Sequence, residues 1–398
     1  MWVPFIGILF MGIACGVASH TAPTYLHELS HHKRRGMIVS GHNAAVAAGL
    51  AISITVGLYE APHIAWTCVT LMPFVVSAVL LAVSPASPLW LAERNQPEAK
   101  IKVALVRVHG PGDYAEQELA GFRQKKAEIF SNNVKSPSVY KPLGISIGLM
   151  FAQQSTGIGG FLSNVYLLSE TNTNTIAFSL SHLLASLLAP FLLDRFGRTT
   201  MLHISSTLES IGLLILGFGW TAAKTTLAGT WYQNLGTMSG LCIFIIGYSL
   251  GHGTVPWVMM NELLPRKAKT LTTTASASSN WFFDTILTPF FTIMLAKFGG
   301  PPTFFVFCLL VVLSMVFVKY LVPETAGLTL DELEELFSKL FDTVFSRSRN
   351  NDVSIPVGND SSSSPEGPRQ SNALTAVPPP TVGHETRQSN ALTTAHPQ

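Results

Sequence analysis

The amino-acid sequence predicts an all-α membrane protein that crosses the bilayer nine times. Hydrophobic residues make up 47% of the 398 residues and charged residues only 12%, about half the charged share of soluble domains. The mean hydropathy is +0.35. Nine segments are long and apolar enough to cross about 30 Å of hydrocarbon as helices that rise about 1.5 Å per residue. They are residues 2–22, 37–58, 64–83, 142–168, 174–193, 199–220, 235–260, 271–296 and 302–322.

The nine segments form two groups separated by a polar stretch. Residues 1–85 hold the first three, which are predicted to form a partial N-terminal bundle. Residues 86–141 follow, with runs of helical character from Glu98 to Val108 and from Tyr114 to Phe130, and are predicted to be a cytosolic helical linker. Residues 142–322 hold the other six segments with short loops between them, as expected of a six-helix C-terminal bundle.

Two further segments follow the last predicted span. Residues 323–345 include a charged amphipathic stretch, Leu328 to Leu340, and are predicted to form a short cytosolic amphipathic helix. Residues 346–398 are rich in Ser, Pro, Asn and Thr. Because such a composition cannot bury a hydrophobic core, this segment is predicted to be a disordered cytosolic tail.

Lysine and arginine residues are concentrated in alternate loops. If the loop at residues 23–36 lies in the cytosol, the cytosolic loops contain 17 of these residues, and the opposite side contains only Lys224 and Lys297. Positive residues favour the cytosolic side. We therefore expect a multi-pass protein of the plasma membrane with its amino terminus outside and its carboxyl terminus in the cytosol. The first apolar stretch lacks the features of a cleaved signal peptide, and none is predicted.

Two neighbouring amides, Gln153 and Gln154, lie inside a stretch from Pro142 to Leu168 that contains no charged residue, and three glycines follow closely. An amide offers both donors and an acceptor, which suits the hydroxyl groups of a sugar. The pair therefore indicates a water-accessible cavity for a neutral polyhydroxy ligand. The alternative interpretation is that the amides hydrogen-bond only to neighbouring helices.

Other chemistries are not indicated by the sequence. The four cysteines lie inside predicted spans without metal-ligand or redox spacing, and we interpret them as small apolar packing residues. No Ser/His/Asp arrangement, metal-ligand cluster or phosphate-binding loop is recognisable, so we predict no enzyme activity, no metal site and no cofactor. The formal net charge of +2 gives no reason to expect nucleic acid as a partner, because the basic residues line the inner face of the lipid bilayer.

Six short motifs occur along the sequence. They are Pro23-Thr-Tyr25-Leu-His-Glu28 with Arg35-Gly36, Gln153-Gln154-Ser-Thr-Gly157-Ile158, Asp194-Arg195-Phe-Gly197-Arg198, Gly253-Thr-Val-Pro256-Trp257 with Glu262, Asn280-Trp281, and Val322-Pro323-Glu324-Thr325. In this order and spacing they resemble the motifs of sugar transporters of the major facilitator superfamily, and the resemblance extends from Met1 to about Phe337. It implies a helical bundle of the major-facilitator type, in which the nine spans are equivalent to helices 4–12 of a twelve-helix fold. Equivalents of helices 1–3 are expected to be absent.

The resemblance also implies a set of substrate-binding residues. A neutral sugar requires hydrogen-bonding groups and aromatic faces rather than charges. The polar groups that bind substrate in the family fall on Asn43, Gln153, Gln154 and Asn280, with Trp257 as the aromatic floor of the site.

Four positions depart from the family pattern. Asn43 replaces a longer glutamine, so the same contact requires a closer ligand or a water molecule. Gly159 replaces an asparagine, which enlarges the cavity, and Ser249 replaces an acidic residue of animal glucose carriers. His182 also stands where an asparagine is common. It either donates to a sugar hydroxyl and titrates near pH 6.5, or is a neutral histidine bonded to a neighbouring helix.

Two acidic residues, Asp284 and Glu209, fall inside predicted spans. An unpaired carboxylate near mid-span costs roughly 2.5–3.5 kcal/mol on insertion scales. We therefore expect Asp284 to face the cavity or a partner, and Glu209 to do so with a larger role in packing. Neither indicates proton coupling, because the key acid of proton-coupled relatives lies on helix 1.

Six charged residues are predicted to lie at helix ends on the inner face. The resemblance implies that they form salt bridges between helices, which hold the inner gate closed while the outer gate is open. The alternative is that they only set the membrane topology. They are Glu28, Arg35, Asp194, Arg198, Glu262 and Lys269.

These features predict a transmembrane sugar transporter that takes up a hexose or disaccharide by alternating access, either facilitated or coupled. A second class also fits: a non-transporting sugar sensor, or a truncated subunit that modulates a full-length relative as its partner. Three of four repeat units would leave polar groups of the cavity unpaired, at a cost on the order of 1–3 kcal/mol each. If this 398-residue form is the functional one, we therefore expect it to be inactive and unstable unless a longer relative pairs with it.

Overall fold

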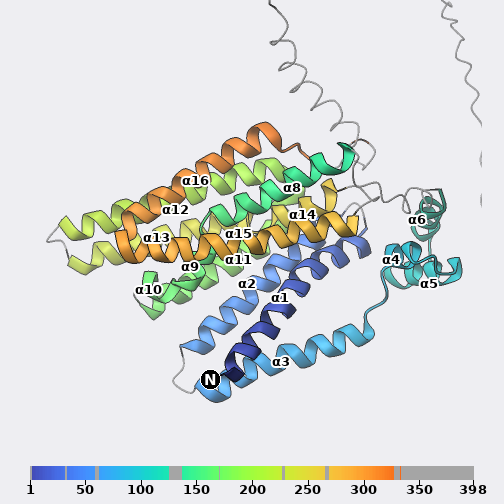
Figure 1. Ribbon diagram of the computed structural model, residues 1–398, viewed down its shortest axis with the longest axis horizontal. Coiled ribbons are helices and arrows are strands. Elements are labelled where there is room, and N and C mark those ends of the chain that lie inside the picture. Colours follow the sequence, from blue (N-terminus) through green and yellow to red (C-terminus); the bar gives the residue numbers. More distant parts are fainter. Residues whose placement is uncertain are drawn as a thin grey trace, which may run out of the picture. The chain divides into compact units, whose positions relative to one another are not determined.

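The computed structural model describes residues 2–326, except 32–33, 59–61, 125–136, 170, 226–228 and 265–268, and also Glu332. Within these residues the regular secondary structure is entirely α-helical, as predicted (Figure 1). They belong to one unit, Met1–Arg347. The predicted amphipathic helix at residues 323–345 lies almost entirely outside the described residues, and the predicted tail at 346–398 lies outside them completely. The division into domains stays a prediction.

Three helices make up the N-terminal part, α1 (Trp2–Leu29), α2 (Arg35–Gly57) and α3 (Pro62–Val83). The polar segment that follows contains short helices, as predicted: α4 (Pro88–Glu93), α5 (Glu98–His109) and α6 (Asp113–Gln124). These three short helices share a small hydrophobic core of their own, centred on Leu105 and Leu119.

The remaining helices form the larger part of the described structure. α11 packs against both α2 and α13, and α12 lies beside α13 and α16 (Figure 1). α15 packs against α8, α9 and α16. The helices are α8 (Pro137–Ser155), α9 (Ile158–Ser163), α10 (Val165–Ser169), α11 (Asn172–Phe196), α12 (Arg198–Thr225), α13 (Gly229–Leu250), α14 (Val255–Leu263), α15 (Lys269–Phe298) and α16 (Gly300–Leu321).

Seven helical segments among the described residues are long and apolar enough to cross a membrane, and each matches a predicted span. One of them, Leu235–Leu263, comprises α13 and α14. The predicted span at 142–168 is instead divided into α8, α9 and α10. In α3, only the shorter apolar helix Pro73–Val83 is identified among the described residues. Large apolar side chains are exposed on the helix surfaces, for example Phe74, Leu81 and Phe191. Such extensive apolar exposure indicates a lipid environment.

The break between α8 and α9 follows from a glycine. Gly157 has a φ of +83°, in the left-handed region that favours glycine. Its N–H donates to the carbonyl of Gln154 at 3.0 Å, which closes α8, and its carbonyl accepts from the N–H of Phe161 at 3.0 Å, which opens α9. A Cβ atom at Gly157 would lie 2.7 Å from Cδ1 of Phe307. The backbone conformation and the packing of this break therefore both require glycine.

A second break separates α13 from α14 at residues 251–254. The carbonyl of Tyr248 accepts hydrogen bonds from the N–H groups of Gly251 (3.3 Å) and Gly253 (2.7 Å), and the Thr254 hydroxyl donates to the carbonyl of Ser249 at 2.9 Å. These bonds satisfy part of the backbone that a continuous helix would have satisfied. In a membrane such an irregular segment is tolerated only inside protein or along a cavity.

Glycines bring α12 and α13 into close contact. A Cβ atom at Gly251 would lie 2.3 Å from Cβ of Ser205, and one at Gly247 would lie 2.9 Å from the backbone nitrogen of Glu209. Gly247 lies in α13 and Gly251 follows directly after its end, and the two glycines have the four-residue spacing of the small-xxx-small pattern of membrane helix packing. This close approach places side chains of α12 directly against the turn at 251–254.

We predict that Gly157→Ala destabilises the protein. Forcing an L-residue into the left-handed region costs roughly 1–2 kcal/mol, and the added methyl group also displaces the Phe307 ring. Thermal unfolding of the purified protein in detergent should show a lower midpoint for this variant. Gly144→Ala on α8 is the matched control, because no atom lies within 4 Å of the added Cβ. Equal midpoints for the two variants would contradict the role of Gly157 in the break.

Candidate functional site

A cavity of about 470 Å³ lies between α1 and α2 on one side and α8, α9, α13, α14 and α15 on the other. This volume is within the range of about 300–1,000 Å³ typical of small-molecule sites. Both helix breaks contribute to its wall, through Gln154 and Gly159 from one and Gly253 from the other. Five of the six predicted substrate-binding residues line it: Asn43, Gln153, Gln154, Trp257 and Asn280.

Three of these residues form a chain of amides whose direction is set by a backbone carbonyl. The carbonyl of His252 can only accept, so the nitrogen Nε2 of Gln153 faces it, at 2.7 Å. The oxygen Oε1 of Gln153 then accepts from Nδ2 of Asn280 at 2.6 Å, and Oδ1 of Asn280 accepts from Nε2 of Gln154 at 3.0 Å. Each orientation follows from the one before it.

The three amides differ in the hydrogen-bonding capacity that they leave for a ligand. Nε2 of Gln153 also lies 3.4 Å from the Tyr248 hydroxyl, and Nδ2 of Asn280 lies 3.5 Å from the sulfur of Met150, so both N–H groups of each amide have partners. The side chain of Gln154 makes no other hydrogen bond with the described residues. Its Oε1 and its second N–H are therefore the free acceptor and donor at the cavity wall.

Asn43 connects the N-terminal helices to the second break. Its Nδ2 donates to Oγ of Ser186 on α11 at 3.2 Å and to Oγ1 of Thr254 at 3.1 Å. Because both bonds use the nitrogen, the oxygen Oδ1 is left to accept from a ligand. Trp257 lies at the same wall, and its ring meets that of His42 in a T-shaped contact with centroids 6.1 Å apart.

His182 is not among the described residues that line the cavity. It is buried, its ring stacks on Tyr248 with centroids 6.3 Å apart, and its Nδ1 lies 3.4 Å from Oγ of Ser249. The cavity is lined here by Tyr248 instead. A direct contact between His182 and a ligand stays a prediction, and the geometry favours the alternative of a histidine bonded to a neighbouring helix.

Asp284 lines the cavity, which is one of the two positions expected for it. Its Oδ1 accepts from the Thr288 hydroxyl at 2.8 Å. A Cβ atom at Gly159 would lie 2.3 Å from this oxygen and 2.0 Å from Oγ1 of Thr288. Because Gly159 has no side chain, the side chains of Asp284 and Thr288 can occupy the space next to it. Glu209 is fully buried and does not line the cavity.

Three of the predicted gate residues meet in one cluster at the ends of α11, α12 and α14. Arg198 donates through Nη2 to Oε1 of Glu262 at 2.8 Å and through Nε to Oε2 at 3.2 Å, a two-bond pairing that is stronger than a single contact. Asp194 interacts with Arg198 and with the backbone N–H of Met37 on α2. This cluster thus joins α2 to the C-terminal helices.

Gly36 makes this contact possible. A Cβ atom at Gly36 would lie 2.7 Å from Oδ1 of Asp194 and 2.8 Å from Nη2 of Arg198. Any side chain at this position would push the two charged groups away from α2. The Arg-Gly pair found in the sequence therefore has a steric reason, in addition to the charge of its arginine.

Glu324, whose role sequence reasoning missed, holds the start of α12. Its carboxylate accepts from the backbone N–H groups of Arg198 (2.9 Å) and Thr199 (3.0 Å) and from the Thr199 hydroxyl (2.6 Å). Next to it, the Thr325 hydroxyl donates to Oε2 of Glu262 at 2.6 Å. The signal was present in the Val322-Pro323-Glu324-Thr325 motif, because a carboxylate suits the unpaired N–H groups of a helix start.

Among the other predicted gate residues, Glu28 has a described side chain, and it makes a different contact. Glu28 instead accepts a hydrogen bond from the Ser87 hydroxyl. Ser87 also caps α4 by accepting from the N–H of Trp90 at 3.3 Å. Ser87 therefore connects Glu28, at the end of α1, to the start of α4. The side chains of Arg35 and Lys269 lie outside the described residues.

Comparisons with known proteins agree with the motifs. A sequence model described as "Sugar (and other) transporter" matches residues 1–337. The chain is 30% identical over 346 residues to "Facilitated trehalose transporter Tret1" of Drosophila mojavensis, covering 82% of this chain but only 39% of the relative. It is 28% identical over 356 residues to "Putative sugar transporter ERD6-like 13" of Arabidopsis thaliana, covering 85% of this chain and 71% of the relative.

A solved structure shares the fold. The proton:xylose symporter XylE of the major facilitator superfamily, bound to 6-bromo-6-deoxy-D-glucose, superposes with a TM-score of 0.68 at 22% identity. The alignment covers 82% of this chain and 72% of XylE. The fold class predicted from the sequence is thereby confirmed as the major-facilitator type.

We predict that Glu324 makes stability depend on pH. Burial alone raises the pKa of this carboxyl, but hydrogen bonds from the Thr199 hydroxyl and from three backbone N–H groups outweigh it, and the pKa lies below its ordinary value of 4.5. A lowered pKa in the folded state contributes stability above pH 4.5 that is lost as the pH falls below that value. Glu324→Gln should therefore lower the unfolding midpoint at pH 7 and shift it less at pH 4.

The control for this experiment is Glu116→Gln. Glu116 pairs with Lys102 at 2.5 Å, but both side chains are exposed, and surface pairs contribute little. If Glu324→Gln and Glu116→Gln gave the same dependence of the midpoint on pH, the assigned role of Glu324 at the start of α12 would be wrong.

Proposed function

Because the chain belongs to the sugar transporter family, whose sequence model matches residues 1–337, we propose that it binds a neutral hexose or disaccharide and moves it across the membrane by alternating access. It is a multi-pass membrane protein, and its family consists of transporters rather than enzymes. The observation that carries the proposal is the amide chain at the cavity wall, which ends in the free donor and acceptor of Gln154.

The chemistry of the wall supports a sugar as the ligand. A sugar hydroxyl both donates and accepts hydrogen bonds. The side-chain amide of Gln154 carries both a free acceptor, Oε1, and a free donor, its second N–H, and so suits such hydroxyls. Asn43 adds an acceptor from α2 to the cavity wall. Trp257 adds the aromatic surface that packs against the apolar face of a sugar ring. We therefore propose Asn43, Gln154 and Trp257 as direct contacts, with Gln153 and Asn280 holding Gln154.

Alternating access requires contacts that break while the site stays intact. The cluster of Asp194, Arg198 and Glu262 supports such a role, because Asp194 contacts the start of α2 while Arg198 holds Glu262 within the C-terminal helices. We propose that the Asp194 contact to α2 opens and closes, and that the Arg198–Glu262 pair persists. No feature of the described residues favours the alternative of a non-transporting sensor.

The proposed location is the plasma membrane, with the amino terminus outside and the carboxyl terminus in the cytosol. The 17 to 2 distribution of lysine and arginine supports this orientation. It predicts that the Asn359-Asp-Ser361 sequence carries no glycan in a eukaryotic host. Glycosidase treatment followed by mass spectrometry checks this prediction. A glycan at Asn359 would contradict the proposed orientation.

We predict that Gln154→Ala weakens sugar binding about 5- to 30-fold, corresponding to about 1–2 kcal/mol for the lost hydrogen bonds. Binding of radiolabelled hexoses and disaccharides to purified protein measures the change. Asn164→Ala is the matched control, because this amide bonds Gly160 and Thr292 rather than lining the cavity. If both variants bound sugar as well as the unaltered protein, the site assignment would have to be abandoned.

A further inference from the structure

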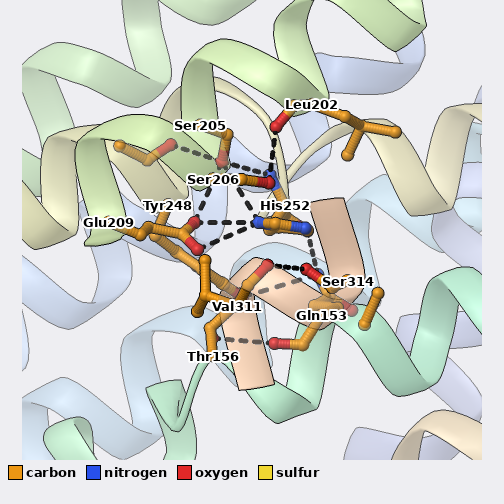
Figure 2. Close-up of polar contacts among 12 residues, drawn as sticks. Gln153, Thr156, Leu202, Ser205, Ser206, Glu209, Tyr248, His252, Val311 and Ser314 are labelled. Atoms are coloured by element: carbon orange, nitrogen blue, oxygen red, sulfur yellow. Dashed lines mark hydrogen bonds and ion pairs between the residues drawn. The ribbon is translucent and has the colours of Figure 1, made fainter. Parts of the chain in front are cut away.

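We propose that Glu209 and His252, whose side chains lie outside the cavity, are positioning residues that determine how the amide chain presents Gln154 to the sugar. The inference rests on the proposed function and adds two residues that no motif in the sequence singles out as a pair. Figure 2 shows Glu209 on α12 and His252 in the turn at 251–254, with Gln153 on the far side of His252 from Glu209.

The two side chains form a completely buried pair. Both are 0% exposed, and Nδ1 of His252 lies 3.0 Å from each carboxylate oxygen of Glu209 (Figure 2). A buried carboxylate requires a partner, and His252 supplies it. Glu209 also accepts from the Ser205 hydroxyl at 2.9 Å. The carboxylate is thus held by α12 on one side and by the second helix break on the other.

The backbone of His252 is held by the same group of residues. Its N–H donates to Oγ of Ser205 at 3.0 Å, so Ser205 contacts both the backbone of His252 and the carboxylate of Glu209. His252 belongs to the turn at 251–254, where helical hydrogen bonding is interrupted. Side chains of α12 therefore provide the contacts that a helix would otherwise have provided. They fix the direction in which the His252 carbonyl points.

That carbonyl is the first acceptor of the amide chain. Gln153 donates to it at 2.7 Å, and this bond decides which end of the Gln153 amide faces Asn280. Asn280 in turn decides which end of Gln154 is bound and which end is free. If the carbonyl turned away, Gln153 could reverse its amide, and the donor and acceptor offered to a ligand would exchange places along the chain.

A purely structural pair would not need this connection. Glu209 and His252 could hold α12 against α13 with the carbonyl of His252 bonded to any neighbour. Instead, the shortest polar contact of that carbonyl is to a residue of the cavity wall. Tyr248, which lines the cavity, gives a second connection. Its hydroxyl lies 3.4 Å from Nε2 of Gln153 and is close enough to Glu209 to interact with its charge.

The test compares sugar affinity with stability in purified protein. Glu209→Gln keeps the shape of the side chain but removes its charge, and we expect about 5- to 20-fold weaker binding and a raised KM for uptake into proteoliposomes, with kcat changed less than about twofold. Ser205→Ala should act in the same direction. Ser206→Ala is the control, because Ser206 is buried next to Ser205 and its hydroxyl, among the described residues, donates to the carbonyl of Leu202 on its own helix.

Two further measurements separate positioning from stability. In a Gln153→Ala background the first amide is gone, so adding Glu209→Gln should change the affinity less than about twofold. The double variant Glu209→Met with His252→Phe leaves no unpaired charge in the core, and it should recover the unfolding midpoint while the weaker binding remains.

The following outcomes would contradict the inference or the function on which it rests. Loss of thermal stability in Glu209→Gln with unchanged affinity would overturn the inference and leave a structural pair. Equal effects of Glu209→Gln with and without Gln153 would overturn it as well. Should Glu209→Gln fail to fold, the double variant decides, because unaltered affinity in that protein contradicts the proposal. Absence of sugar binding in the unaltered chain would instead contradict the proposed function.

Discussion

One hydrogen bond, from the side-chain amide of Gln153 to the backbone carbonyl of His252, joins the two places where the membrane helices are broken. A broken helix leaves backbone groups without partners, and lipid offers none. The breaks are therefore stable only where other polar groups contact them. Here the amide of Gln153 near the first break bonds the carbonyl of His252 in the second. The end of α8 brings two amides, the turn at 251–254 brings a carbonyl, and a cavity forms where they meet.

The same constraint explains why glycines and buried polar groups are concentrated around this point. Gly157 allows the first break, and Gly251 lets α12 approach the second closely enough for Ser205 and Glu209 to hold it. The arrangement places held polar groups along the wall of the cavity. At the helix ends, Asp194 contacts α2 through the backbone of Met37. A carrier needs this combination of a fixed site and a separable contact.

Much of the site could be predicted from the sequence, because its motifs carry the residue types directly. Gln153, Gln154, Trp257 and Asn280 were assigned to one cavity and do line it. The division of labour among them could not be predicted, since the direction of the amide chain depends on a backbone carbonyl that has no sequence signature. His182 shows the converse. Its position in the motif pattern left a ligand contact and a bond to a neighbouring helix both open, and the structure shows its ring stacked on Tyr248, which lines the cavity. The continuous span at 142–168 was predicted from apolar length, which does not reveal that Gly157 interrupts it.

The central claim is that the two joined helix breaks form a sugar site whose free donor and acceptor belong to Gln154. The most direct measurement is an experimental structure of the protein purified and saturated with the sugar that it binds most tightly. The account predicts sugar density in the cavity, with a hydroxyl within hydrogen-bond distance of Oε1 of Gln154 and the ring against Trp257. Sugar density that lies elsewhere, or that contacts Gln153 while Gln154 faces away, would contradict it.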